Sequence, residues 1–455
     1  MSPVNPSTHS AAILTIGNEL LNGDVVNTNA SWLGQALRGI GVPCETVLTV
    51  PDSRDRIVSA IGQLWAEHDL VIVSGGLGPT RDDVTKRALL DFFEDTLVRD
   101  SSVLEHVSRY FLQRGREVTE VNRCQADVPS RATVLFNDLG TAPGLLFDVG
   151  GRLLAAMPGV PYELHHITGK RLIPELEKRW KKAERRVVQR YFRTTGVGES
   201  DLSDRILSEL EQRIPPEVDF AFLPHPQGVD IRISQVNGGP DSGFEPFVEW
   251  VRETAGELIY SEDYRQSLAA RIVEMLAESG RTLALAESCS GGYLADALTD
   301  VPGSSRCFAG GVVAYSNEVK VRQLGVDPAV LEEHGAVSAP VALAMAQGAA
   351  QRLGTDFGIS TTGVAGPGGG TPDKPVGTVW IGLWAAGGTH VALRFRFTTE
   401  RLVNKERTFA AAMDLLRRHV TGIPGFPYHP EVVHGAPEGA RSPAQHPHPQ
   451  LKSGA

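Results

Sequence analysis

Short apolar segments alternate with amphipathic segments through the first third of the chain, a rhythm typical of parallel strands joined by helices. The segments 11–16 and 69–74 are almost continuously apolar and predict buried strands. Between them, apolar residues at helical spacing over 32–40 predict a helix that one of residues 27–29 caps. We therefore expect residues 11–168 to form a doubly wound α/β domain.

The pattern changes twice more along the chain. Residues 169–261 combine a basic helical run with short strand-like pieces, which predicts a small α+β connecting domain. A second α/β rhythm over 262–421, with strands expected at 282–286 and 308–315, predicts another α/β domain. Residues 422–455 are rich in Pro, His, Gly and Ser and lack apolar periodicity, so we expect a disordered tail.

The composition narrows the partners that this chain can have. It has 455 residues, a formal net charge of −10 and 22% charged residues, so a broad basic surface for nucleic acid is not expected. Its four cysteines are widely spaced without a C-x-x-C pair, which argues against a disulfide framework or a zinc ribbon. No apolar run is long enough to cross a membrane and no export signal is evident, so we expect a cytoplasmic protein.

The turn after the strand expected at the second apolar run is a candidate phosphate site. Gly76 and Gly78 let backbone amides approach an anion, and the helix that follows adds positive potential. Asp82 and Asp83 would repel a bare phosphate unless a divalent cation bridged them, which favours a metal–nucleotide site. The alternative is structural, because Thr80 and Asp83 can form a capping box while both acids complement the helix dipole.

Three further segments, 17–33, 137–144 and 157–164, accompany this turn. Together they closely resemble the molybdopterin-binding-like domain of the CinA family (competence/damage-inducible protein). The resemblance implies a doubly wound sheet and a nucleotide-like ligand; some members hydrolyse ADP-ribose with a metal, and related domains bind a pterin or its adenylate. It implies a divalent metal held by Asp82 and Asp83. The expected substrate-binding residues are Asn18, Glu19, Asn27, Gly76 and Gly78.

A second candidate site follows the strand expected at 282–286. Ser288 stands at the strand-to-helix turn, where a hydroxyl is exposed and backbone amides are free to bind an oxyanion. Lys320 can serve as its base if burial or a nearby cation lowers the lysine pKa from about 10.4, and Tyr315 can relay the proton. Taken singly, these residues also fit a helix cap, a solvated lysine and a rim tyrosine. The glycine-rich loop 363–377 favours a ligand site, because such loops are kept for close backbone approach.

The motifs of this region resemble those of the CinA C-terminal domain, which is similar to the bacterial amidase PncC. They are AESCSGG at 286–292, GSS at 303–305, AYSNEVK at 314–320, HGAVS at 334–338 and TTGVAGPGGG at 361–370. The resemblance implies conversion of nicotinamide mononucleotide (NMN) to nicotinic acid mononucleotide and ammonia without a cofactor. It makes Ser288 the nucleophile, Lys320 the base and Tyr315 the helper. The expected substrate-binding residues are Ser305, Thr362, Gly363, Gly366 and Arg401.

Several alternatives stay open at this point. Cys289 is a rival nucleophile because it adjoins Ser288. The basic residues of 170–193 could meet DNA phosphates in a competence- or damage-associated binding or scaffold protein without amidase activity, although interspersed glutamates favour a solvated helix face. A third possibility makes the N-terminal domain the main enzyme, a pyrophosphatase for ADP-ribose. The resemblance also implies a homodimer.

Overall fold

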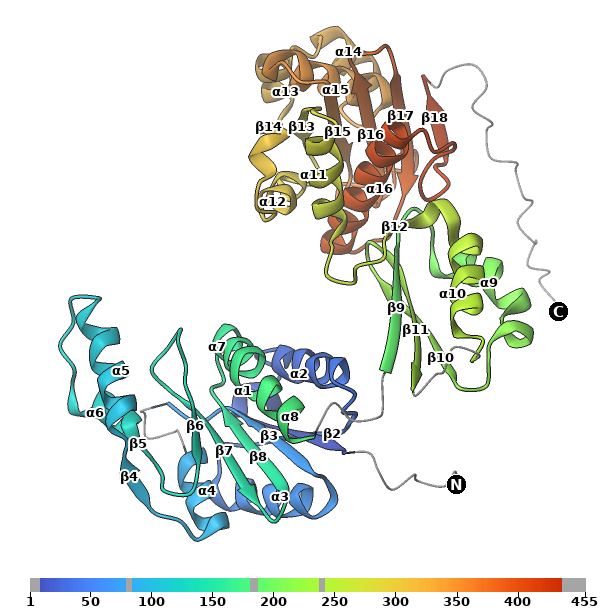
Figure 1. Ribbon diagram of the computed structural model, residues 1–455. Helices are drawn as coiled ribbons and strands as arrows, with labels where there is room; N and C mark the ends of the chain where they lie inside the picture. The colour runs from blue at the N-terminus through green and yellow to red at the C-terminus, as the bar shows by residue number, and fades with distance from the viewer. Residues whose placement is uncertain (1–8, 79–83, 181–186, 237–241, 436–455) are drawn as a thin grey trace, which may run out of the picture. The chain divides into compact units, whose positions relative to one another are not determined.

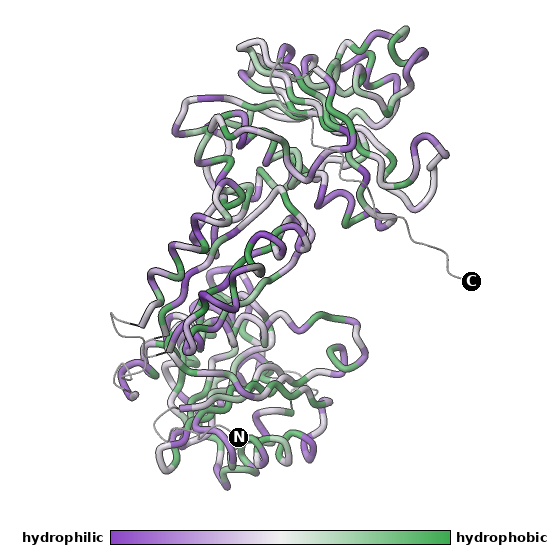
Figure 2. The backbone as a smooth tube through the Cα atoms, turned by 90° about the vertical axis from the view of Figure 1, so that its right-hand side faces the viewer, coloured by the Kyte–Doolittle hydropathy of each residue, from purple (hydrophilic) through white to green (hydrophobic). Residues whose placement is uncertain are grey.

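The computed structural model describes residues 9–78, 84–180, 187–236 and 242–435. They form two compact units that divide near residue 188, and each is described by itself (Figure 1). The predicted α/β class is confirmed, since each unit contains a six-stranded sheet and the second also contains a four-stranded one. Figure 2 shows hydrophobic segments interspersed with hydrophilic ones along the backbone. Within these ranges, no helix has the length and apolar character needed to cross a bilayer.

The first unit is built on a mixed sheet. Its strands are β1 (Ala11–Ile16), β2 (Cys44–Val50), β3 (Leu70–Ser74), β6 (Thr133–Leu135), β7 (Gly144–Val149) and β8 (Arg152–Met157). The helices around it are α1 (Asn18–Leu21), α2 (Thr28–Gly39), α3 (Arg54–Glu67), α4 (Thr85–Phe93), α7 (Pro161–Ile167) and α8 (Ile173–Arg179). The order is β2-β1-β3-β8-β7-β6, and the first four strands run parallel. Their carboxyl ends therefore share one edge of the sheet.

Helices cover both faces of this sheet because alternate residues of a strand point to opposite sides. Ala12 and Leu14 of β1 pack in one cluster with α3 and α4. Ala11 and Ile13 pack in another cluster with α2, α7 and α8. The sequence of β1 is continuously apolar because both of its faces are buried. The predicted doubly wound arrangement is confirmed.

The first domain extends further than predicted. A π-helical turn at Thr168–Leu172 (η2) joins α7 to α8 in one continuous helical segment. Leu172 and Leu176 are buried in the same cluster as Leu164, so the whole segment belongs to this core. The predicted boundary after residue 168 falls inside the segment. The charged surface of α8 concealed its buried leucines in the sequence pattern.

A separate lobe of the first unit lies between α4 and β6 (Figure 1). It contains the antiparallel pair β4 (Leu97–Arg99) and β5 (Asp127–Pro129), helices α5 (Ser101–Leu112) and α6 (Glu120–Arg123), and the 3-10 turn η1 (Cys124–Ala126). Val103 and Val107 of α5 pack on Ala126 to form its small core. The lobe places η1 beside the carboxyl edge of the main sheet, where Gln125 lines a cavity described below.

The second unit begins with the small α+β domain that the sequence predicts. Its strands are β9 (Val187–Thr194), β10 (Val218–His225), β11 (Gly228–Val236) and β12 (Ile259–Ser261), in the order β10-β11-β9-β12. Its helices are α9 (Glu199–Arg213), α10 (Phe244–Ala255) and the 3-10 turn η3 (Gly256–Leu258). Phe192, Ile231 and Ile233 are fully buried in it.

The C-terminal domain of the second unit has its own six-stranded sheet. Its strands are β13 (Leu283–Glu287), β14 (Phe308–Val313), β15 (Phe357–Gly363), β16 (Thr378–Ala385), β17 (His390–Arg396) and β18 (Val432–His434). Its helices are α11 (Leu268–Glu278), α12 (Tyr293–Thr299), η4 (Ser304–Arg306), α13 (Asn317–Leu324), α14 (Pro328–His334), α15 (Ala339–Leu353) and α16 (Arg401–Thr421). The order is β14-β13-β15-β16-β17-β18; the first three strands run parallel and the others antiparallel.

The central strand β13 is covered on both sides. Leu283 and Leu285 pack with α11, α12 and α16. Ala284 and Ala286 pack with α13, α14 and α15. Small alanines on one side let these helices approach the strand closely, which brings α13 near the carboxyl end of β13.

The segment after α16 is ordered further than predicted. Strand β18 pairs with β17 at the edge of the sheet. The Tyr428 hydroxyl lies 3.2 Å from Thr195 Oγ1 and donates to the carbonyl of Gln227, both in the α+β domain. Disorder from residue 422 was therefore the wrong prediction for 422–435, because edge pairing through the main chain needs no apolar periodicity. Residues 436–455 lie outside the described ranges.

A buried ion cluster joins α16 to the α+β domain. Asp414 is fully buried, and its two oxygens lie 2.6 Å from Arg417 Nη2 and 2.8 Å from Arg418 Nε. Arg417 also donates to the carbonyl of Glu257 at 2.7 Å. Gly196 packs so closely that an added Cβ would lie 2.5 Å from Asp414 Oδ2. The α+β domain and the C-terminal domain thus form one packed unit.

Candidate functional site

The turn after β13 holds Ser288 in a fixed position. The Ser288 N–H donates to the carbonyl of Thr361 on β15 at 2.9 Å, at the carboxyl edge of the parallel strands. The preceding Glu287 is 2% exposed, and its carboxylate accepts hydrogen bonds from the first turn of α12. The donors are the N–H groups of Gly292 (3.0 Å), Leu294 (3.1 Å) and Ala295 (2.8 Å). A carboxylate at a helix N-terminus is favourable, so Glu287 ties the turn to both strand and helix.

Helix α13 delivers a buried lysine to this serine. Lys320 is 1% exposed, and its Nζ lies 3.1 Å from Ser288 Oγ. The same Nζ donates to the carbonyl of Ala314 at 2.8 Å and to that of Tyr315 at 3.4 Å. Burial lowers the pKa of Lys320, which favours the neutral amine. A neutral amine has two N–H groups for the two carbonyls and one lone pair left for the Ser288 hydroxyl.

The neighbouring thiol lacks the properties of a nucleophile. Cys289 is buried, and burial raises its pKa to about 12. The thiolate is the reactive form of cysteine, so this side chain stays protonated and unreactive near neutral pH. The geometry therefore favours Ser288 over Cys289 as the nucleophile.

Tyr315 and Arg401 meet at a solvent-exposed position rather than beside the lysine amine. Tyr315 is 62% exposed, and its hydroxyl accepts a hydrogen bond from Arg401 Nη2 at 3.1 Å. Arg401 Nη1 also donates to the carbonyl of Gly366 at 2.9 Å. The hydrogen bond between Lys320 and Tyr315 is made by the backbone carbonyl of Tyr315. The structure thus brings Tyr315, Arg401 and Gly366 together, and the hydrogen bond recorded for the Tyr315 hydroxyl joins it to Arg401.

The remaining predicted residues of this domain fall into different places. Thr362 is 1% exposed and its hydroxyl donates to the carbonyl of Ala336 at 2.7 Å, which ties β15 to the HGAVS loop. Gly363 and Gly366 are required by packing, because an added Cβ would lie 2.5 Å from Thr378 O and 2.6 Å from Val376 Cγ1, respectively. Ser305 is exposed on η4, and within the described ranges it has no side-chain hydrogen bond to the serine–lysine pair. Behind Ser288, the buried hydroxyls of Ser290 and Thr361 lie 2.6 Å apart.

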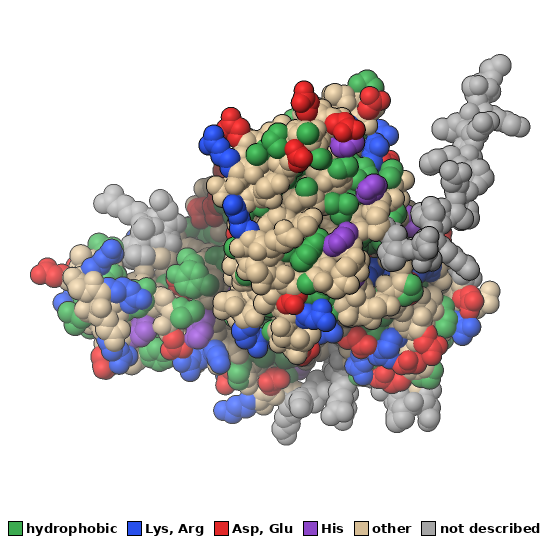
Figure 3. Space-filling model, turned by 90° about the horizontal axis from the view of Figure 1, so that it is seen from above, with side chains coloured by type: hydrophobic (Ala, Val, Ile, Leu, Met, Phe, Trp, Pro, Cys, Tyr) green, Lys and Arg blue, Asp and Glu red, His purple; other side chains and the backbone are tan. Residues whose placement is uncertain are grey.

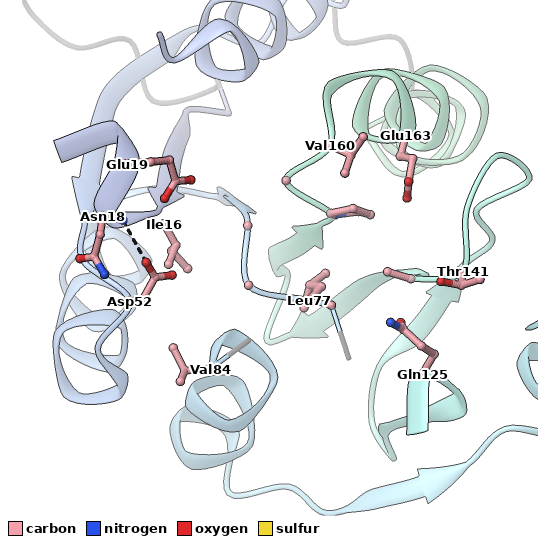
Figure 4. Close-up of a pocket in the computed structure, with 16 residues that line it drawn as sticks. Ile16, Asn18, Glu19, Asp52, Leu77, Val84, Gln125, Thr141, Val160 and Glu163 are labelled. Carbon is pink, nitrogen blue, oxygen red and sulfur yellow. Dashed lines mark hydrogen bonds between the residues drawn. The ribbon is translucent and has the colours of Figure 1, made fainter. Parts of the chain in front are cut away.

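The first unit holds a cavity of about 840 Å³ at the carboxyl edge of its parallel strands (Figure 4). The turn after β3 forms its floor, and close packing explains the glycines there. An added Cβ at Gly75 would lie 2.5 Å from Ile16 O, and one at Gly76 would lie 2.2 Å from Thr85 Oγ1. Both glycines have positive φ, at 112° and 65°. The position is the one at which open α/β sheets bind ligands.

Four of the five predicted substrate-binding residues of the N-terminal domain line this cavity. They are Asn18, Glu19, Gly76 and Gly78. The fifth, Asn27, has another role: its side chain accepts from Ala30 N at 3.1 Å, capping α2, and donates to Thr15 Oγ1 at 3.0 Å. The cavity also has polar lining residues that were not predicted from the sequence: Asp52, Gln125, Thr141 and Glu163. Asp52 follows β2 at the same edge. Thr141 and Glu163 lie in the segments 137–144 and 157–164 that carry the family resemblance, whereas no feature of the sequence marks Gln125.

The predicted metal ligands Asp82 and Asp83 lie outside the described residues. Among the residues that are described, no three His, Cys, Asp or Glu side chains gather closely enough to hold a metal ion.

The basic segment considered as a DNA contact is only partly described. Its α8 portion includes Arg179, which pairs with Glu175 at 2.7 Å and with Asp148. On the face shown in Figure 3, basic and acidic side chains are interspersed. The ion pairs of Arg179 agree with a solvated helix face.

The fold and the two sites define a class of α/β protein with two site-bearing domains in one chain. One is a doubly wound domain with a cavity at the carboxyl edge of its sheet, and the other is an α/β domain with a buried serine–lysine pair. Two family models match the chain: the probable molybdopterin binding domain over residues 12–178 and the CinA C-terminal domain over residues 265–420.

Full-length relatives match nearly the whole chain. A CinA-like protein of Chlorobium limicola is 40% identical over 414 residues, covering 89% of this chain and 95% of its own. A CinA-like protein of Salinibacter ruber is 41% identical over 412 residues, covering 90% and 98%. A solved competence/damage inducible protein from Agrobacterium tumefaciens is 38% identical, covering 34% of this chain and 93% of its own, with a TM-score of 0.33. The chain belongs to the CinA family.

Proposed function

We propose that the C-terminal domain is an amidohydrolase that converts NMN and water to nicotinic acid mononucleotide and ammonia. The observation that carries this proposal is the buried Lys320 amine, 3.1 Å from Ser288 Oγ, with two backbone carbonyls accepting its N–H groups. A serine with a neutral lysine as its base is an arrangement for nucleophilic attack on a carbonyl carbon. The choice of NMN rests on the likeness of the motifs to those of nicotinamide-nucleotide amidases.

In the first half of the reaction, Ser288 Oγ attacks the carboxamide carbon while Lys320 Nζ takes the hydroxyl proton. The C–N bond then breaks, and the Lys320 ammonium returns the proton to the leaving nitrogen, which departs as ammonia. The Ser288 ester of the nicotinate group remains. The fixed turn matters here, because a nucleophile held in place does not lose rate to reorientation.

In the second half, Lys320 accepts a proton from water, and the resulting hydroxide attacks the ester carbon. The C–O bond to Ser288 breaks and the Lys320 proton returns to Ser288 Oγ, which regenerates the starting site. Arg401 is suited to bind the phosphate of NMN, because its guanidinium is exposed and matches phosphate geometry. Its bond to the Tyr315 hydroxyl gives that tyrosine a positioning role in our proposal.

The test is ammonia release from NMN by the full chain. We expect Ser288→Ala and Lys320→Ala to abolish release, and the matched control Cys289→Ala to keep it within a few-fold of wild type. Full activity in Ser288→Ala would overturn the serine mechanism. No release from folded wild-type protein would favour the alternative of a competence- or damage-associated binding or scaffold protein, which DNA titration at several salt concentrations would examine.

A second function is favoured by the cavity of the first unit. We propose that this domain binds a nucleotide and hydrolyses ADP-ribose with a divalent metal, because the glycine turn and the polar lining suit such a ligand. The test measures AMP formation from ADP-ribose in the Ser288→Ala variant, with Mg²⁺ or with EDTA. AMP formation that EDTA abolishes supports the proposal, and absence of AMP under both conditions contradicts it. A homodimer remains part of the proposal, and sedimentation equilibrium measures it.

A further inference from the structure

Two buried polar side chains face the cavity of the first unit from separate elements. Glu163, on α7, is 9% exposed, and Gln125, on η1, is 2% exposed. Both line the cavity, and Figure 4 shows their polar ends directed toward its interior. Neither was expected from the sequence to bind a ligand. Side chains of this kind are seldom buried without hydrogen-bond partners.

The oxygen of the Gln125 amide is the notable group of this pair. This Oε1 atom is buried and, within the described ranges, has no hydrogen bond. An amide can present its oxygen or its NH₂ group to the same position by rotating, so it suits a ligand group that both donates and accepts. A buried amide oxygen without a hydrogen bond is costly, and a ligand in the cavity can supply the missing donor.

The Glu163 carboxylate is held in place by its surroundings. Asn137 Nδ2 donates to Glu163 Oε2 at 2.5 Å, and the Asn137 oxygen accepts from Leu139 N and Gly140 N. Gly140 leaves the space that the carboxylate fills, because an added Cβ there would lie 2.3 Å from Glu163 Oε2. A fixed carboxylate accepts hydrogen bonds and cannot donate them. It therefore selects a group that carries N–H or O–H donors.

The cavity is chemically uneven, and this orients its ligand. The glycine turn after β3 offers close backbone approach to a phosphate, whereas the Glu163 carboxylate repels one. Glu19 and Asp52 lie across the cavity from Glu163 (Figure 4). We infer that Gln125 and Glu163 form a specificity subsite for the donor-bearing part of a nucleotide, either its vicinal ribose hydroxyls or an exocyclic amino group, while the phosphate lies toward the glycine turn. This inference rests on the proposed nucleotide ligand.

The experiment is calorimetric titration of the full chain with AMP, 2′-deoxy-AMP and IMP. IMP replaces the amino group of AMP by a carbonyl, and 2′-deoxy-AMP lacks one ribose hydroxyl. We expect wild type to bind one of these two analogues at least about ten-fold more weakly than AMP, since a site built to hydrogen-bond a donor rejects the analogue without it. The weakened analogue identifies which donor the subsite reads.

Variants link that discrimination to the two residues. Glu163→Gln and Gln125→Met keep side-chain size and are expected to weaken AMP binding about ten-fold and to remove the discrimination between AMP and the weakened analogue. Glu177→Gln, an exposed glutamate on α8, is the matched control and should bind like wild type. Gln125→Met removes a buried amide oxygen that has no hydrogen bond within the described ranges. The melting temperature of this variant should therefore not fall below that of wild type, which controls for misfolding.

The outcomes separate the inference from the function on which it rests. Equal binding of all three nucleotides by wild type, or unchanged discrimination in both variants, overturns the subsite and leaves the nucleotide site standing. Absence of all nucleotide binding by wild type overturns the proposed nucleotide function and the subsite with it.

Discussion

The two six-stranded sheets place their candidate sites at the same topological position, yet they use it in opposite ways. In the first unit, the turn after β3 opens into a cavity of about 840 Å³, which Gln125 lines, and its Oε1 has no hydrogen bond among the described residues. In the second unit, the polar groups at the turn after β13 are already hydrogen-bonded within the protein. Glu287 accepts from the N-terminus of α12, and Lys320 is bonded to Ser288 and to the carbonyl of Ala314.

The difference teaches how polar groups at a sheet edge divide between two tasks. Groups left without protein partners suit the recognition of a ligand, since the ligand completes their hydrogen bonds. Groups that the protein has already oriented suit proton transfer, since the reacting atoms do not have to rearrange. The predictions below test this division, beginning with the largest expected effect.

The largest effect is expected when the amine of Lys320 is removed and the shape of the side chain is kept. Lys320→Met should lower kcat/KM for NMN by about 10³-fold, because general base catalysis contributes 10²- to 10⁴-fold, whereas ADP-ribose hydrolysis should be unchanged. The fold should survive, since Lys320 is 1% exposed among largely apolar neighbours. Ammonia release and circular dichroism measure the two effects. Retention of more than a tenth of the activity would show that the lysine is not the base.

The second prediction loosens the turn without touching the dyad. Glu287→Gln leaves one acceptor oxygen for three backbone N–H groups, so the C-terminal domain should lose about 2 kcal/mol of stability. Because Glu287 positions Ser288, kcat should fall about ten- to a hundred-fold with a smaller change in KM. Urea unfolding and steady-state kinetics measure both. Unchanged kcat with lowered stability would restrict Glu287 to a structural role.

The third prediction concerns the open site. Gly76 and Gly115 have nearly equal φ angles, 65° and 66°. A Cβ atom added at Gly76 would lie 2.2 Å from Thr85 Oγ1, whereas one added at Gly115 would have no atom within 4 Å. Gly115→Ala should cost about 1 kcal/mol for the left-handed backbone alone. Gly76→Ala should cost more and abolish AMP binding while leaving ammonia release intact. Equal effects of the two substitutions would remove the packing argument.

The smallest effect expected is on pH dependence. Burial lowers the folded pKa of Lys320 below its unfolded value, so the unfolded state binds more protons between the two. The stability of the C-terminal domain should therefore rise with pH from the folded pKa up to about 10.4, and Lys320→Met should lose this rise. The activity of wild type should rise with pH through the same folded pKa. Parallel stability curves for wild type and Lys320→Met would contradict a depressed lysine pKa.

The sequence predicted the individual helices and strands well, and the tertiary contacts between them less well. The apolar run at β1 and the strand-to-helix turn at Ser288 were identified because their residues are adjacent in sequence. Gln125 was missed because the lobe that carries it reaches the cavity only through tertiary packing. Glu287 looked like an ordinary charged strand end, and its burial depends on three N–H groups contributed by the next helix.

Errors at the domain boundaries have a similar cause. The segment containing Leu172 and Leu176 is too charged on its outer side to reveal its buried leucines, and the segment 422–435 is held by main-chain pairing and by Tyr428 instead of an apolar stripe. Such contacts join residues far apart in the chain, and local pattern does not record them.

The anchoring of Tyr428 and Asp414 on the α+β domain has a consequence for the order in which a ribosome can complete this protein. Chains emerge N-terminus first, and domains generally fold as they appear. The surface around Gly196 and Gln227, however, is covered by groups more than two hundred positions downstream. This surface of the α+β domain therefore stays exposed until nearly all of the polypeptide has been synthesised. The two domains of the second unit then reach their final packing together.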